Sequence, residues 1–165
     1  MIRLFGGVLI FIVSSYCGFW FSGVLKKRRD FLRAMSGALS FVATEIEFVH
    51  SELEKILVRA GKSPALCGFF PCCVAEIKEN GIQNAWRKAV DECAVNLKDA
   101  EKDVLIHLGG QLGMSDIRGQ KNVIAGTVRQ LDEYAKLADE EYIRLSKPYR
   151  SCGILLGVFI LIMIA

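Results

Sequence analysis

The chain has 165 residues, of which 52% are hydrophobic and 24% are charged, and its formal net charge at pH 7 is +3. All 18 acidic residues but only 15 of the 21 basic residues fall within Asp30–Lys147, so the middle is net −3 and the positive excess lies toward the ends. Because no basic stripe crosses the middle, the composition argues against nucleic acid as a partner. The length fits one domain with short extensions.

The first element, Leu4–Leu25, is predicted to be a membrane anchor. Its 22 residues include no Asp, Glu, Lys or Arg, and 12 of them are Leu, Ile, Val or Phe. A helix of this length is about 33 Å long, which matches a hydrocarbon core of about 30 Å. A cleaved signal peptide, the alternative, carries its positive charges before the apolar region rather than after it. Residues 1–25 are therefore assigned to an uncleaved transmembrane helix.

Positive charges beside this segment predict its orientation. Lys26-Lys27-Arg28-Arg29 follows it directly, whereas only Arg3 precedes it. Lys and Arg favour the cytoplasmic side of a membrane, so we expect the amino terminus outside and the middle of the chain in the cytoplasm. The same charges are expected to attract anionic lipid headgroups.

Residues 26–148 are predicted to form a cytoplasmic helical bundle. From Asp30 to about Ala60, apolar residues recur at spacings of three and four, which is typical of one amphipathic helix. These seam residues are Leu32, Met35, Leu39, Val42, Ile46, Val49, Leu53 and Ile56. A break follows at residues 61–64, and the apolar stretch Ala65–Val74 is expected to form one or two short helices around Pro71.

Three further helices are predicted in the second half of the bundle. Asn84 is expected to cap a helix over residues 85–96, and a helix over Lys98–Leu112 follows, with Gly113 just past its end. Ser115 or Asp116 is expected to cap the last helix, from Ile117 nearly to Pro148. No alternation typical of a strand competes, so the predicted class is all-α, an antiparallel bundle of about 5–6 helices.

The last element, residues 149–165, is predicted to be a second transmembrane segment. Its apolar part, Ser151–Ala165, has 15 residues and follows Arg144, Lys147 and Arg150. At about 22 Å it is short for a span, so a half-inserted tail stays an alternative. The flanking charges again favour the cytoplasm, and we therefore expect both termini outside.

Small residues recur every four positions in both predicted anchors. These are Ser14, Gly18 and Ser22 in the first and Gly153 and Gly157 in the second. This spacing lets membrane helices approach closely, so the five residues are candidates for transmembrane packing. The alternative is that Gly is simply frequent in membrane helices.

The sequence predicts no catalytic residue, metal site, cofactor or small-molecule substrate. His50 with Glu47 and Glu54, and His107 near Asp103, are more typical of solvated helix faces than of metal or catalytic sites. The three cysteines Cys67, Cys72 and Cys73 lack a usual zinc spacing, and we interpret them as reduced, packed thiols. Gly109-Gly110 lacks the Lys and Ser/Thr of a phosphate loop.

Several motifs together resemble the stage III sporulation protein AB family. The most specific is Leu112-Gly113-Met114-Ser115-Asp116 followed by Gln120. Others are Gly7 in the anchor, Glu45-Ile46 at the centre of residues 39–53, Ala85-Trp86, Leu131, and residues 149–157. The chain departs from the family in its number of cysteines and in Gly109-Gly110, a pair expected to loosen its helix.

The resemblance implies a non-enzymatic platform in the channel complex that links mother cell and forespore. The family's cytoplasmic domain is similar to the helical domains of platform proteins in type II secretion and type IV pilus systems. The implied partners are a cytoplasmic ATPase, ring-forming membrane subunits and lipids of the mother-cell membrane. Candidate interface residues are Glu45, Leu112, Gly113, Asp116 and Gln120. The alternatives are that Glu45 only pairs with a nearby Arg and that the turn at residues 112–116 only ends two helices. The alternatives are a type II secretion or pilus platform subunit and a membrane-surface enzyme.

Overall fold

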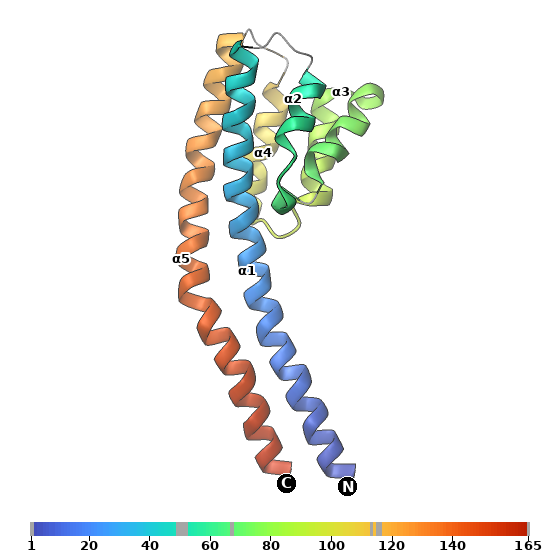
Figure 1. The fold of residues 1–165 in the computed structure, drawn as a ribbon, viewed down its shortest axis with the longest axis vertical. Coiled ribbons are helices and arrows are strands. Elements are labelled where there is room, and N and C mark those ends of the chain that lie inside the picture. Colours follow the sequence, from blue (N-terminus) through green and yellow to red (C-terminus); the bar gives the residue numbers. More distant parts are fainter. Residues whose placement is uncertain (1, 49–52, 67, 113, 115–116, 165) are drawn as a thin grey trace. The chain divides into compact units, whose positions relative to one another are not determined.

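The structure is a computed structural model that describes residues 2–48, 53–66, 68–112, 114 and 117–164. For some of these, including residues 2–11 and 46–48, it describes the backbone alone. The elements are α1 (Ile2–Phe48), α2 (Leu53–Ala60), the 3₁₀ turn η1 (Pro64–Leu66), α3 (Phe69–Cys93), α4 (Asp99–Gln111) and α5 (Ile117–Ile164). No strand occurs among the described residues, so the predicted all-α class is confirmed (Figure 1).

The chain divides into two compact units. Met1–Arg29 and Leu137–Ala165 form one, here called the terminal unit, and Asp30–Lys136 forms the other, the central unit. The helices α1 and α5 contribute to both, and α2, η1, α3 and α4 belong to the central unit alone.

Large apolar side chains fill the core of the central unit. Trp86, Phe69 and Phe70 are fully buried and meet edge to face, with ring centroids 5.0–6.1 Å apart. Aromatic pairs in this arrangement stabilise a core beyond the apolar area that they bury. Around them lie the buried side chains of Leu32, Met35, Leu39, Ile56, Leu57, Leu66, Leu105, Leu108, Ile124 and Leu131.

The predicted seam helix is correct in its buried face but wrong in its extent. Leu32, Met35, Leu39 and Val42 are buried on α1, and Ile56 is buried on α2. The predicted single helix from Asp30 to Ala60 is instead the last part of α1 and the separate helix α2. At the other end α1 continues back to Ile2, since Lys26–Arg29 contains no residue that ends a helix.

The first and last long helices of the central unit run antiparallel, as predicted. The Ser36 hydroxyl on α1 donates a 2.5 Å hydrogen bond to the Asp132 carboxylate on α5. The two helices lie side by side in Figure 1. Thus residues 96 positions apart in the sequence lie on facing helices of this unit.

The predicted cap at Asn84 is wrong, because the turn lies three residues earlier. Gly81 within α3 has φ 73° and ψ 164°, a conformation open essentially to Gly alone. The Asn84 side chain instead donates to the Asn80 carbonyl oxygen at 3.0 Å. The two halves of α3 then lie antiparallel, with contacts from Glu76 to Lys88 and from Cys72 to Glu92.

The helix α4 confirms the predicted segment within one residue at each end, and it shows what Gly109 does. The Trp86 indole N–H donates to the Leu105 carbonyl oxygen at 2.8 Å, so the ring packs against α4. A Cβ atom added to Gly109 would lie 2.3 Å from Trp86 Cδ1, whereas one added to Gly110 would meet nothing within 4 Å. Gly109 therefore admits the indole, while the expectation that the pair loosens the helix stays a prediction.

The last helix does not end near Pro148 as predicted. That residue lies inside α5, which continues to Ile164. A proline removes its own N–H donor and displaces one carbonyl, and neighbouring residues with helical preference can continue the helix as a kinked one. The predicted break and the start of a separate terminal segment are therefore replaced by one helix of 48 residues.

Among the described residues, no helix contains a stretch that is both long and apolar enough to cross a bilayer. The side chains of residues 4–11, which belong to the predicted first anchor, lie outside the description.

Candidate functional site

Of the small residues predicted for transmembrane packing, Ser14, Gly18 and Gly153 meet inside the terminal unit. Gly18, Ser22, Gly153 and Gly157 are buried, and the Ser14 hydroxyl donates to the Gly153 carbonyl oxygen at 2.8 Å. We call these five residues the small-residue seam. They belong to α1 and α5, the helices at the two ends of the same chain.

No room exists at the centre of this seam for a larger side chain. A Cβ atom added to Gly18 would lie 2.6 Å from the Tyr149 carbonyl oxygen, and one added to Gly153 would lie 2.8 Å from the Ser14 carbonyl oxygen. Backbone atoms cannot rotate away as a side chain can. The close approach of α1 and α5 therefore depends on glycine at both positions.

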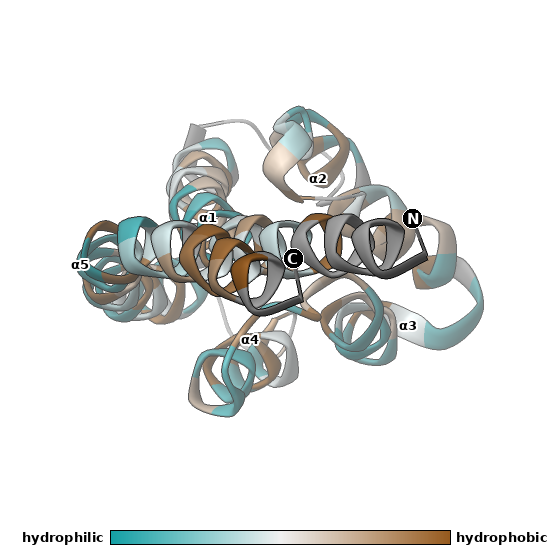
Figure 2. Ribbon diagram, turned by 90° about the horizontal axis from the view of Figure 1, so that it is seen from below, coloured by the Kyte–Doolittle hydropathy of each residue, from teal (hydrophilic) through white to brown (hydrophobic). Residues whose placement is uncertain are grey.

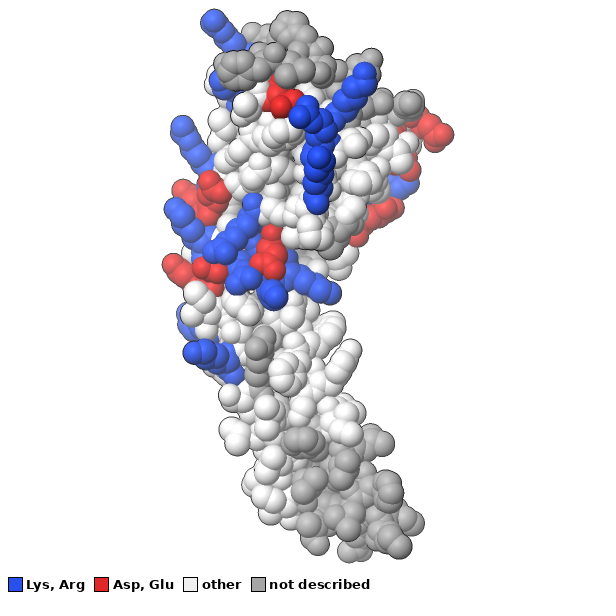
Figure 3. All heavy atoms as spheres, viewed as in Figure 1, with Lys and Arg blue, Asp and Glu red and all other residues white. Residues whose placement is uncertain are grey.

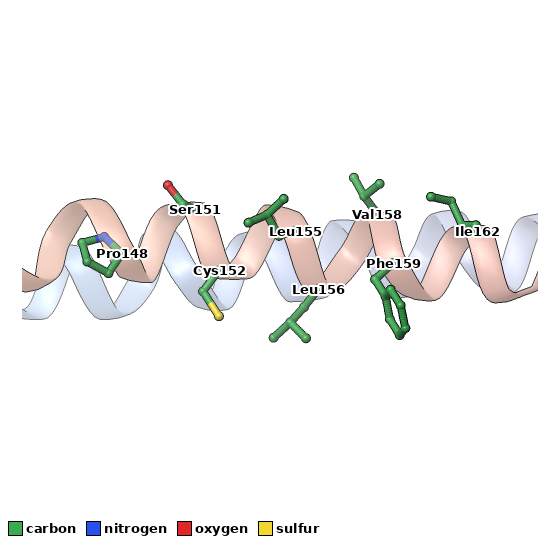
Figure 4. A pocket seen from close by; sticks show the side chains of 8 residues that line it. All are labelled: Pro148, Ser151, Cys152, Leu155, Leu156, Val158, Phe159 and Ile162. Atoms are coloured by element: carbon green, nitrogen blue, oxygen red, sulfur yellow. The ribbon is translucent and has the colours of Figure 1, made fainter.

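The outer face of the terminal unit is apolar. Exposed large side chains include Ile12, Phe19, Trp20, Leu155, Phe159 and Ile162. A shallow groove of about 640 Å³ runs along α5 from Pro148 to Ile162 (Figure 4). Cys152, Leu156 and Phe159 project to one side of it and Ser151, Leu155 and Val158 to the other. Figure 2 shows the described end of α5 as strongly hydrophobic.

Charged residues of α1 and α5 meet within the terminal unit, and Figure 3 shows basic and acidic side chains gathered on the face in view. Arg28, whose side chain is 6% exposed, contacts the Glu141 carboxylate at 2.5 Å. Arg29 lies 3.6 Å from the Asp139 carboxylate, and its guanidinium lies 4.5 Å from the Tyr142 ring centroid. These contacts join α1 to α5 through charges.

Glu45, the first candidate interface residue, is engaged within the central unit. Its carboxylate accepts a hydrogen bond from the Arg59 guanidinium at 3.0 Å, and that guanidinium lies 5.7 Å from the Phe41 ring centroid. The structure therefore places Glu45 in the contact that the alternative interpretation foresaw, a pair with a nearby Arg.

The structure describes two of the four other candidate interface residues, Leu112 and Gln120. Leu112 is buried, and Gln120 is half-buried in α5. Gly113 and Asp116 lie outside the described residues, as does the predicted cap at Ser115. Between them in sequence stands Met114, which is 75% exposed. Met114 belongs to the motif at residues 112–116, but it was not predicted to be an interface residue.

A hollow of about 290 Å³ opens beside Met114. It is lined by Leu112 and Met114 on one side and by the five residues of the α3 turn, residues 80–84, on the other. The Gln83 side-chain amide donates to the Gly110 carbonyl oxygen at 3.2 Å and ties the turn to α4. We call this feature the turn hollow. Its walls combine apolar side chains with amides, which suits contact with a protein better than ionic chemistry.

Two cysteines of the central unit, Cys72 and Cys73, have raised pKa values. Burial, together with the Glu92 carboxylate 3.4 Å away, raises the pKa of Cys72 to about 11. Burial raises the pKa of Cys73 to about 12. Thiols of this kind are mostly protonated near neutral pH and react slowly. Cys67 lies outside the described residues.

The remaining candidates for chemistry do not converge in the part of the chain that the structure describes. His107 is exposed, and its Nε2 lies 3.2 Å from the Gln111 side-chain nitrogen. His50 lies outside the described residues. No three His, Cys, Asp or Glu side chains among those described are arranged to hold a metal ion.

Comparison with known proteins identifies the class. The family model described as stage III sporulation protein AB matches residues 3–165. The chain therefore belongs to the stage III sporulation protein AB family. It is 22% identical over 170 residues to the stage III sporulation protein AB of Bacillus subtilis (strain 168), with 99% of each chain covered. No solved structure matches the chain. The family supports a role in sporulation, and its name states no enzymatic activity.

Proposed function

We propose that the chain is a non-enzymatic platform subunit of the membrane channel complex that links mother cell and forespore. The terminal unit is anchored in the mother-cell membrane with both termini outside. The central unit lies in the cytoplasm and docks a partner ATPase, which supplies the hydrolysis. Ring-forming membrane subunits of the same complex are the other neighbours.

The observation that carries this proposal is the inverted distribution of side chains in the terminal unit. Its interior holds Gly18, Gly153 and other small residues, while its surface exposes Phe19, Leu155, Ile162 and further large apolar side chains. A helical hairpin in water buries its large apolar residues instead. Helices in lipid pack through small residues and turn large apolar ones outward. This distribution supports anchoring at both ends.

The turn hollow is the surface that we assign to the ATPase. Met114 offers an exposed, adaptable apolar side chain, which is favoured at protein interfaces. The hollow adjoins the motif at residues 112–116 that carries the strongest resemblance to the family. Its amides at Asn80, Gln83 and Asn84 can bind the backbone of a partner segment.

Photo-crosslinking from single positions tests this assignment. A photoreactive amino acid at Met114 is expected to crosslink to the ATPase in sporulating cells. The same amino acid at Val95 is the matched control, since Val95 is also a large exposed apolar residue of the central unit at 68% exposure. Equal crosslinking from both positions, or none from Met114, would contradict the assigned surface.

Cysteine labelling tests the topology separately. In a chain whose own cysteines are replaced by Ser, one cysteine is placed at Lys62 and another is appended after Ala165. A membrane-impermeant maleimide applied to intact cells should label the appended cysteine only. Labelling of Lys62→Cys from outside would reject the proposed orientation.

A further inference from the structure

The basic run at residues 26–29 divides into two pairs with different surroundings. Arg28 and Arg29 turn toward α5, where they meet Glu141, Asp139 and the face of Tyr142. Lys26 and Lys27 are exposed. The sequence presents four adjacent cations, but two of them are committed to contacts inside the terminal unit.

Two exposed cations of α5 lie at the same level along the paired helices as Lys26 and Lys27 of α1. The Phe21–Tyr149 ring contact and the Arg28–Glu141 ion pair mark two levels at which α1 and α5 touch. Lys26 and Lys27 lie between those levels on α1, and Arg144 and Lys147 lie between them on α5. The interval is seven residues on one helix and eight on the other, about 12 Å of helix. We call these four residues the basic collar.

An aromatic layer borders the collar. The rings of Phe21 and Tyr149 stack with centroids 5.8 Å apart, and Trp20, which is 58% exposed, meets Phe21 edge to face. Beyond them the described surface is apolar, with Phe19 and Leu155 exposed. Membrane proteins show this order from water through the lipid headgroup layer into hydrocarbon: cations come first, then amphipathic aromatics, then apolar side chains.

We infer that the basic collar binds the headgroups of anionic phospholipids. The inference rests on the proposed membrane anchoring and adds the class of lipid. Exposed Lys and Arg beside a membrane attract anionic lipid, and each contributes about as much as a five-fold change in binding. Because Arg28 and Arg29 are already paired with carboxylates, they stabilise the hairpin that holds the collar together. The collar combines residues 26–27 with residues 144–147, which only the paired helices bring to one level.

The test uses Trp20 as a reporter in the full chain. The protein is reconstituted in phosphatidylcholine vesicles that contain a small fraction of either phosphatidylglycerol or phosphatidylcholine with brominated acyl chains. Brominated chains quench an indole on contact, and the buried Trp86 contributes a constant background. We expect brominated phosphatidylglycerol to compete for the site about five-fold or more better than brominated phosphatidylcholine, with the preference falling as salt rises.

Variants assign the preference to the collar. The change K26Q/K27Q/R144Q/K147Q should bring the ratio of the two lipids close to one, and K26R/K27R/R144K/K147R should keep it. The control K62Q/R87Q/R118Q/R129Q removes four exposed charges from the central unit and should also keep it. A ratio near one in the unaltered chain, or an unchanged ratio in the glutamine collar variant, overturns the inference.

Failure of the anchoring proposal gives a different result. If neither brominated lipid quenches Trp20, the terminal unit is not in the bilayer, and both the anchoring and the lipid preference are wrong. Equal quenching by both lipids leaves the anchoring supported and removes the lipid preference alone. Equal quenching by both lipids is also the result expected if the true partner of the collar is an acidic protein.

Discussion

The central and terminal units pack their helices with side chains of opposite size. In the central unit Trp86, Phe69 and Phe70 fill the space between helices, and glycine is needed where the indole crosses α4. In the terminal unit small residues bring the two backbones together, and the large residues lie outside. The comparison teaches that one chain can pair its helices in two opposite ways, and the second way is the one that the proposed membrane anchoring calls for. Burial of large apolar groups stabilises helices in water, and close backbone contact stabilises them in lipid.

The two tryptophans of the chain give the sharpest test of this contrast. Trp86→Ala removes a fully buried ring and its hydrogen bond to α4, and we expect a loss of about 3–5 kcal/mol in the free energy of unfolding. Trp20→Ala removes an exposed ring and should leave that free energy nearly unchanged. Urea unfolding of the full chain in detergent, followed by circular dichroism, measures both. Similar losses would show that the two units are not built differently.

Two neighbouring glycines of α4 should respond with opposite signs. Gly109→Ala places a Cβ atom against Trp86, and we expect a loss of about 1–3 kcal/mol from overpacking. Gly110→Ala meets no neighbour and should stabilise the helix by up to about 1 kcal/mol. The same unfolding measurement applies. A gain from both changes would show that the indole can move aside.

Breaking a buried ion pair should lower the free energy of unfolding more than breaking an exposed one. Arg28→Gln leaves the Glu141 carboxylate without its cation in a mostly buried contact, with an expected loss of about 1–2 kcal/mol after allowance for the partly exposed Glu141. Arg59→Gln breaks a pair whose Arg side chain is 58% exposed, and the expected loss is under about 1 kcal/mol. Thermal unfolding at low and high salt checks both. A larger loss for Arg59→Gln than for Arg28→Gln would show that burial does not decide which pair stabilises the chain more.

Helix separation reports on the seam of the terminal unit. Gly18→Ala forces a Cβ atom toward the Tyr149 carbonyl oxygen, so α1 and α5 should move apart by about 1 Å, enough to restore ordinary contact. Gly23→Ala meets nothing within 4 Å and should not separate them. Spin labels on the exposed Cys17 and Cys152, with the other cysteines replaced by Ser, give the distance. An unchanged distance in Gly18→Ala would show that the seam tolerates a methyl group.

The smallest expected effect is on the reactivity of a thiol. The Glu92 carboxylate helps to hold the pKa of Cys72 at about 11, so Glu92→Gln should lower that pKa toward the ordinary value of 9.0 without reaching it, since burial remains. Alkylation of Cys72 near pH 9 should then become several-fold faster, because the thiolate is the reactive form. Mass spectrometry follows Cys72, with Cys73 as the internal reference. A rate unchanged by the substitution would mean that burial alone sets the pKa.

The sequence predicted those features of the fold that depend on periodic burial. The three–four spacing of Leu32, Met35 and Leu39 identified the buried face of α1, and the class and the antiparallel pairing followed from it. The errors fall where one residue acts through its contacts in space. Gly81 and Asn84 are both plausible breaks, and only the observed turn decides between them. From the sequence alone, Gly109 is predicted only to weaken its helix. The structure shows that Trp86, 23 positions away, packs against it.

The candidate site was less predictable than the fold. The spacing of Ser14, Gly18 and Gly153 marked close-packing positions, but not that the two sets meet each other. Met114 and the turn hollow were not predicted, because a pocket formed by residues 80–84 together with Leu112 and Met114 has no signal in a linear pattern. Two exposed features, the apolar Met114 and a glycine turn, would have been the only hints.

The pairing of the two ends of the chain also decides when the terminal unit can form during synthesis. Ser14 and Gly153, which share a hydrogen bond, are 139 positions apart. At a synthesis rate of about 5–20 residues per second, the leading helix waits roughly 7–28 s before its companion leaves the ribosome. During that delay its glycine face has no partner helix from the same chain. A chain that stops early therefore keeps that face uncovered.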